Sequence, residues 1–138
     1  SWAGNARMSP SRPYLMRALY EWIQENECTP YVLVDANILE VQVPLEHVND
    51  GQIVLNINAS AVRDLLIDNE AMSFSARFSG VTQNIYVPIV AVLAIYAKEN
   101  GEGMVFGNEA GAPDPTDTPP PSKKETRPSG RPSLSVVK

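Results

Sequence analysis

The side chains that could carry out chemistry in this chain are few and stand apart from one another. A single histidine, His47, lies between Glu46 and Val48, and a single cysteine, Cys28, follows a predicted helix. Nucleophilic catalysis needs a nucleophile beside a base, and a zinc site needs several Cys or His ligands. We therefore predict no catalytic residue and no metal site, and we interpret His47 as a surface residue and Cys28 as a small hydrophobe.

Two other groupings resemble functional motifs. Asp35, Glu40 and Glu46 could supply paired carboxylates, but a solvated acidic face is the simpler interpretation. The Asn-Gly-Glu-Gly run at 100–103 lacks the Gly-Lys of a phosphate-binding loop, so we interpret it as a turn that ends a helix. No cofactor is expected from either grouping.

The segment 72–78 is the best candidate for a binding surface. Its alternation predicts a strand with an apolar face of Met72, Phe74, Ala76 and Phe78. The opposite face carries Ser73, Ser75 and Arg77. Small and polar side chains at adjacent positions could leave a shallow groove, in which an extended peptide would gain backbone hydrogen bonds and side-chain pockets. The candidate peptide-binding residues are Phe74, Ser75, Ala76, Arg77 and Phe78.

One helix and several short strands must position this segment. Residues 11–27 show helical spacing, with Ser11 as N-cap, Pro13 in the first turn and an apolar stripe of Leu15, Ala18, Leu19, Trp22 and Ile23. Apolar runs separated by turns predict strands at 31–34, 41–43, 53–57, 65–67, 72–78, 83–87 and 104–106. The Ala-rich stretch 88–100 predicts a short second helix. The fold class is therefore mainly β, a small, strongly bent sheet or barrel with an N-terminal amphipathic helix.

The first helix has two interpretations that stay open together. Its apolar stripe can cover the protein's own sheet, or its aromatic residues can form a subunit interface. The candidate interface residues are Tyr14, Leu15, Ala18, Leu19 and Trp22.

Charge separates a body from a tail. Residues 1–109 carry 6 Lys or Arg and 13 Asp or Glu, whereas residues 110–138 carry 5 and 3. An acidic body argues against nonspecific nucleic-acid binding, which needs a basic surface. No apolar run reaches the roughly 18–20 residues that span a bilayer, so no membrane partner is expected. A single cysteine fits a reducing cytosol, and we expect a cytoplasmic protein.

Composition divides the chain into four parts. We expect residues 1–10 to be disordered, with an expression scar before Met8, and 11–109 to form the folded domain. Residues 110–130 are rich in Pro, Asp, Thr and Ser and predict a flexible linker. Residues 131–138 contain an apolar cluster, which we interpret as a tethered ligand for another protein. The cluster consists of Leu134, Val136 and Val137, followed by Lys138.

Several stretches are similar in sequence to one known family. They are Arg12–Leu15, Tyr20–Trp22, Thr29–Pro30, Gln42–Pro44, Asp50–Asn56, Ala76–Phe78, Ala94–Gly101, Gly130–Pro132 and Val136–Lys138. Through them the chain resembles the stringent starvation protein B family, from about residue 11 to 106 and again from 130 to 138. The resemblance implies a homodimer with an Sm-like barrel that serves as a specificity adaptor for the ClpXP protease. It implies pairing through the N-terminal helix and no enzymatic activity.

The resemblance also implies ligands for each part. The tmRNA-encoded (ssrA) degradation tag should lie along 74–78 with Asn56 beside it, and the tail should dock on the zinc-binding N-domain of ClpX through Leu134, Val136, Val137 and Lys138. Ser75 stands where the family pattern has Asn, and Ser135 where it has Arg. Despite these two differences, we expect the backbone contacts of the tag with 74–78 and the apolar contacts of Leu134, Val136 and Val137 to be kept. No nucleic acid, ATP or metal is required.

Two other function classes remain as alternatives. An Sm-like RNA-binding or ribosome-associated regulatory module is disfavoured by the acidic body. A hydrolase would need a nucleophile–base pair, which the sequence does not suggest.

Overall fold

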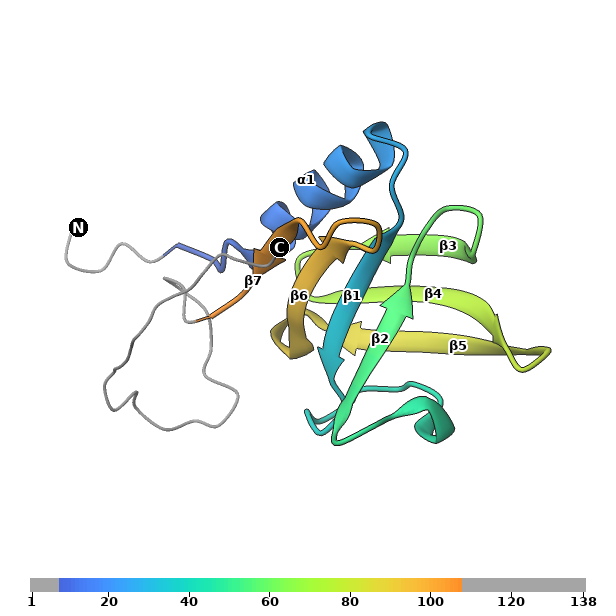
Figure 1. Ribbon diagram of the computed structural model, residues 1–138. Coiled ribbons are helices and arrows are strands. Elements are labelled where there is room, and N and C mark those ends of the chain that lie inside the picture. Colours follow the sequence, from blue (N-terminus) through green and yellow to red (C-terminus); the bar gives the residue numbers. More distant parts are fainter. Residues whose placement is uncertain (1–7, 108–138) are drawn as a thin grey trace.

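A computed structural model describes residues 8–107, and these residues form one α-helix and two β-sheets (Figure 1). The helix α1 spans Arg12–Glu25. The first sheet has the order β2-β1-β6-β7, and the second has the order β3-β4-β5. The strands are β1 (Pro30–Asp35), β2 (Gln52–Asn56), β3 (Val62–Ile67), β4 (Ala71–Phe78), β5 (Val81–Pro88), β6 (Val92–Ala97) and β7 (Gly103–Val105).

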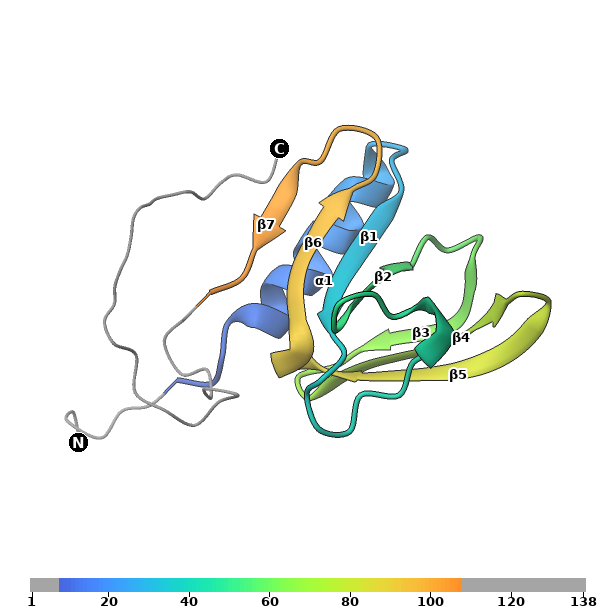
Figure 2. The same ribbon diagram turned by 60° about the horizontal axis from the view of Figure 1, so that its bottom comes forward.

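The two sheets lie across one another, and their inner faces form the core. In Figure 1 the strands of the second sheet run across β1, β2 and β6, while Figure 2 shows α1 lying along β6 and β1. The core is made of aliphatic side chains, methionines and two buried phenylalanine rings, and it includes Val32, Leu55, Ile57, Met72, Phe74, Val87, Ile95 and Phe106. The prediction of a mainly β fold with an N-terminal helix is confirmed; its strands form two open sheets and not a closed barrel.

The turns lie where local sequence predicted them. Asp50 and Gly51 both have positive φ, 57° and 77°, and so do Ser79 and Gly80, 54° and 82°. Two consecutive residues of this kind make the tight turn that matches the twist of paired strands. Asp68 closes the β3–β4 turn by accepting hydrogen bonds from the backbone N–H groups of Glu70 (2.8 Å) and Ala71 (2.9 Å).

The prediction of a second helix at 88–100 is wrong. After a short 3₁₀ turn, η3 (Ile89–Ala91), the chain enters β6, which pairs with β1 on one side and β7 on the other. Ala94 and Ile95 point to opposite faces and both are buried, so β6 is a central strand without a polar face. Such a strand has no period-2 pattern, and its alanines imitate a buried helix.

The neighbouring turn and one predicted strand also differ from expectation. The Asn-Gly pair at 100–101 turns the β6–β7 hairpin and does not cap a helix, with Gly101 at φ 76°. Gly103 is required there because a side chain would overlap the backbone of Ile95 and Tyr96. Residues 41–43 form no strand: Gln42 makes a single bridge to Tyr86, and a 3₁₀ turn, η2 (Leu45–His47), follows Pro44.

The inward face of α1 is rotated from the predicted stripe. Arg12, Pro13, Met16 and Ile23 are buried, whereas Ala18 and Trp22 are exposed. The inward positions 12, 16, 19 and 23 fit helical spacing just as the predicted stripe does. Both stripes are possible because apolar residues occur around most of the helix. Tertiary contacts choose between the two stripes.

Arg12 anchors the start of α1 to the end of the domain. Its guanidinium donates hydrogen bonds to the carbonyls of Val92 (3.0 Å), Val90 (3.2 Å) and Gly107 (2.9 Å), and lies 5.2 Å from the ring centroid of Phe106. Burial of a guanidinium is tolerated where its N–H groups are bonded. This explains how a charged residue takes an inward position on the helix.

Glu99 links the β6–β7 turn to the start of β1. Its carboxylate accepts hydrogen bonds from the Thr29 N–H (2.8 Å) and the Thr29 hydroxyl (2.7 Å). These bonds, the backbone one first, lower the pKa of Glu99 below its ordinary 4.5. A carboxyl whose pKa is lower in the folded state contributes stability above its unfolded pKa and loses it as pH falls through the folded value.

We therefore expect Glu99→Gln to destabilise the domain at neutral pH, and the difference from the wild type to shrink as pH falls below about 4.5. Urea unfolding midpoints of both proteins across pH 2.5–7 would measure this. Thr29→Val keeps the N–H but removes the hydroxyl donor. It should therefore lose less stability than Glu99→Gln, and its difference from the wild type should also shrink as pH falls. A wild-type-to-variant difference that does not change with pH would contradict the assignment.

Candidate functional site

Two adjacent hollows lie along β4, on the second sheet. The first, which we call the arginine hollow, encloses about 560 Å³ and is lined by Ala59, Ser60, Ala61, Val62, Arg63, Ser75, Ala76, Arg77 and Thr82. The second, the aspartate hollow, encloses about 360 Å³ and is lined by Gln42, Asp64, Ser73, Phe74, Ser75, Asn84, Ile85 and Tyr86. Ser75 lines both, so the two hollows are neighbours along β4.

Strand register places the polar lining side chains of the three strands on one face. Ser73, Ser75 and Arg77 of β4 pair with Tyr86, Asn84 and Thr82 of β5, and Arg63 of β3 pairs with Ser75. Directly paired residues share a face of the sheet. This polar face is the one predicted from the alternation of 72–78, and Met72 and Phe74 are buried on the other.

The edge of β4 is open beside the arginine hollow. Pairing with β3 begins at Val62, opposite Ala76, while β4 continues to Phe78. Arg77 and Phe78 therefore have partners in β5 but none in β3. An extended backbone can pair with a free strand edge.

Four of the six predicted groove residues line the hollows. Ser75, Ala76 and Arg77 line the arginine hollow, and Phe74 and Ser75 line the aspartate hollow. Asn56 and Phe78 line neither. Phe78 packs against the core, with its ring centroid 5.6 Å from that of His47.

Asn56 supports the loop that forms one wall. Its Oδ1 accepts a hydrogen bond from the Asn58 N–H (2.9 Å), and the Asn58 Oδ1 accepts two more from the Ser60 N–H and hydroxyl (both 2.9 Å). These are Asx turns, in which a side-chain oxygen holds the backbone two residues on. The spacing of Asn56, Asn58 and Ser60 was the signal that could have indicated an ordered wall at 59–63.

The exposed face of α1 carries a short row of side chains one turn apart. Tyr14 is 50% exposed, Trp22 is 45% exposed, and Ala18 lies between them. Leu15 and Leu19, also predicted for the interface, are half-buried and pack against the core. The row therefore consists of Tyr14, Ala18 and Trp22, with the two leucines on its inner side.

The β3–β4 turn holds Tyr14 in place. Arg17 lies 4.7 Å from the Tyr14 ring centroid and donates hydrogen bonds to the Ile67 carbonyl and the Asn69 Oδ1 (both 2.9 Å). The Asn69 amide in turn donates to the Tyr14 hydroxyl (3.1 Å). The helix row is thus attached to the hairpin whose strands line the hollows.

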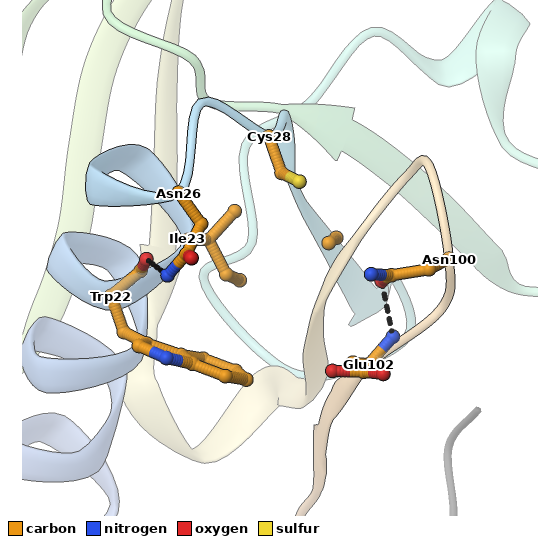
Figure 3. Close-up of a pocket in the computed structure, with 7 residues that line it drawn as sticks. Trp22, Ile23, Asn26, Cys28, Asn100 and Glu102 are labelled. Carbon is orange, nitrogen blue, oxygen red and sulfur yellow. Dashed lines mark hydrogen bonds between the residues drawn. The ribbon is translucent and has the colours of Figure 1, made fainter.

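A smaller pocket of about 180 Å³ lies between the end of α1 and the β6–β7 turn (Figure 3). Its lining residues are Trp22, Ile23, Asn26, Cys28, Ala97, Asn100 and Glu102. Figure 3 shows Trp22 and Glu102 at opposite sides of the pocket and the Cys28 sulfur directed toward it. Because Trp22 also belongs to the helix row, this pocket extends that surface.

The residues considered for chemistry are dispersed. His47 contacts Phe78, Cys28 lies in the pocket at the end of α1, and Asp35 accepts a hydrogen bond from the Asn37 N–H (3.0 Å). Among residues 8–107, His, Cys, Asp and Glu form no group of three or more placed to hold a metal. No helix in the same range is long and apolar enough to cross a membrane.

The predicted docking residues Leu134, Val136, Val137 and Lys138 lie outside the described residues, as do the linker at 110–130 and the first seven residues.

Comparison with known proteins gives one consistent result. Residues 10–138 match the family described as stringent starvation protein B. A curated protein of Haemophilus influenzae, named "Stringent starvation protein B homolog", is 53% identical over 103 residues, which cover 75% of this chain and 69% of that protein.

Proposed function

The chain belongs to the stringent starvation protein B family, and on this premise we propose that it is a nonenzymatic adaptor of the ClpXP protease. It binds the tmRNA-encoded (ssrA) degradation tag of incompletely synthesised proteins along β4. Its C-terminal tail docks on the zinc-binding N-domain of ClpX. Both events take place in the cytoplasm.

The observation that carries this proposal is the pair of adjacent hollows beside an open strand edge. A peptide needs an elongated surface with pockets on alternate side chains and backbone groups with which to pair. The arginine and aspartate hollows supply the pockets, and β4 at Arg77–Phe78 supplies the edge. Small side chains at Ser75 and Ala76 let the peptide approach the sheet closely.

The helix row supports a two-fold dimer. Tyr14 and Trp22 each lie four residues from Ala18, so antiparallel helices crossing at Ala18 place Trp22 of one protomer beside Tyr14 of the partner subunit. A two-fold interface needs such a self-complementary patch. The small side chain at the crossing point allows the helices to approach, and the aromatic rings bury area on either side.

The tail acts as a tether. A flexible linker of 21 residues, 110–130, has a root-mean-square span of roughly 25 Å. Holding a bound substrate at this distance from the protease raises its effective concentration to the order of mM. Two tails per dimer make a weak docking peptide bivalent.

Titration of a fluorescent tag peptide into the purified protein tests the binding half of this proposal. We expect saturable binding with one peptide per subunit, because each subunit carries one pair of hollows. Failure of the tag peptide to bind would overturn the proposed function.

Deleting Leu134–Lys138 tests the tethering half. We expect unchanged affinity for the tag peptide but loss of the acceleration that the adaptor gives to degradation of tagged substrates by ClpXP. Removing five linker residues, 116–120, is the matched control; it should change delivery by less than about twofold, because effective concentration varies slowly with linker length. Unaltered delivery after loss of the terminal cluster would contradict the tail's role.

A further inference from the structure

Positive charge is scarce on this domain, and its distribution is uneven. Residues 8–107 contain twelve Asp or Glu and five Lys or Arg, the five being Arg12, Arg17, Arg63, Arg77 and Lys98. Arg12 and Arg17 donate to backbone carbonyls and hold the helix to the sheets. Of the remaining three, two lie in one place, the arginine hollow.

The register of β3 and β4 brings these two arginines together. Arg63 pairs with Ser75, and Arg77 follows Ser75 by two residues on the same face. Diagonal neighbours of this kind lie about 7–8 Å apart between their backbones, within reach of long side chains. Both arginines are exposed. Two neighbouring like charges repel unless an anion lies between them.

The lining of each hollow differs in charge. The arginine hollow contains no carboxylate; its other polar side chains are the hydroxyls of Ser60, Ser75 and Thr82. The aspartate hollow contains Asp64 and no cation. A peptide lying across Ser75 therefore meets opposite charges on its two sides.

Resting on the proposed function, we infer that Arg63 and Arg77 together select an acidic side chain of the bound peptide. A carboxylate accepts paired, parallel hydrogen bonds from a guanidinium, and it would neutralise the repulsion between the two. We assign the acid to a residue inside the peptide and not to its C-terminus, because the second hollow lets the peptide extend beyond Ser75, away from the two arginines. The two arginines are thus specificity-determining residues.

The test is a binding cycle between protein and peptide variants. The probes are the tag peptide, versions with each acidic side chain changed singly to its amide, and a version amidated at the C-terminus. The proteins are wild type, Arg63→Gln, Arg77→Gln and the control Lys98→Gln, which changes a cation outside both hollows. Thermal unfolding of each variant shows that it is folded.

We expect one acid-to-amide change to weaken binding to the wild type by about two- to fivefold, in the upper part of the range for exposed ion pairs. The same peptide change should not weaken binding to Arg63→Gln or Arg77→Gln, because the partner of the acid is already missing there. Lys98→Gln should lose affinity for the changed peptide as the wild type does. The affinity of the wild type should also fall with added salt more steeply than that of either arginine variant.

Several results would overturn the inference. If the wild type binds the acidic and the amide peptides with equal affinity, the inference is overturned and the proposed function is left intact. An effect confined to the C-terminal amide would assign the arginines to the chain end. Competition by a single-stranded RNA oligonucleotide that depends on both arginines would favour phosphate recognition. If the wild type binds none of the peptides, the inference and the proposed function fail together.

Discussion

Replacing Ala76 with glutamine is expected to block peptide binding while leaving the domain folded. Ala76 lines the arginine hollow beside the open edge of β4 and is half-buried. A glutamine side chain adds four heavy atoms in the path of the peptide. Overpacking of a close-fitting site costs about 1–3 kcal/mol, which lowers affinity by about five- to 150-fold. Titration of a fluorescent tag peptide measures this loss.

The matched control is Leu66→Gln on the neighbouring strand. Leu66 is 55% exposed and lines neither hollow. The Leu66→Gln protein should bind the peptide as the wild type does. Both Ala76→Gln and Leu66→Gln should unfold at nearly the wild-type temperature. Undiminished affinity of a folded Ala76→Gln protein would place the peptide elsewhere on the surface.

Replacing Trp22 with aspartate is expected to convert the proposed dimer to folded monomers. Trp22 is 45% exposed on the outer face of α1, so it contributes little to the core of its own subunit. In the two-fold dimer both copies would be buried at the interface. An unpaired buried charge costs several kcal/mol, and the interface would contain two, which together weaken dimerisation about a thousandfold or more.

Sedimentation velocity over a range of protein concentrations would measure this change. Leu39→Asp is the control, because it puts the same charge on a residue 83% exposed in the loop after β1, far along the chain from the helix. The control should sediment as the wild type. A Trp22→Asp protein that stays folded and dimeric would exclude the outer face of α1 as the interface.

The attachment of the helix row to the β3–β4 turn gives these two sites a physical connection. Asn69 and Arg17 hold Tyr14 through one hydrogen-bonded network. The same turn leads into β4, which carries Ser75 and Ala76. Measuring tag affinity of the Trp22→Asp monomer would therefore report how far the groove depends on dimerisation.

Local sequence determined the turns, the helix and the two-faced strand at the site. The alternation of apolar and polar side chains from Met72 to Phe78 depends on neighbours along the chain, and the Ser79-Gly80 pair permits the positive φ of a tight turn. Both signals act over a few residues, so they can be recognised without knowing what packs nearby. For the same reason the sequence could indicate Phe74, Ser75, Ala76 and Arg77 as residues of the candidate groove, and they line the two hollows.

Long-range contacts decided the rest. The Ala-rich stretch at 92–97 became a strand because β1 and β7 pair with it on both sides, which overrides its helix-forming alanines. The inward face of α1 was selected by the carbonyls that receive the Arg12 guanidinium, about eighty residues away in sequence. Likewise, Arg63 and Arg77 share a hollow only because β3 pairs with β4 in one particular register. Residues distant in sequence meet through pairing and burial, which no local period encodes.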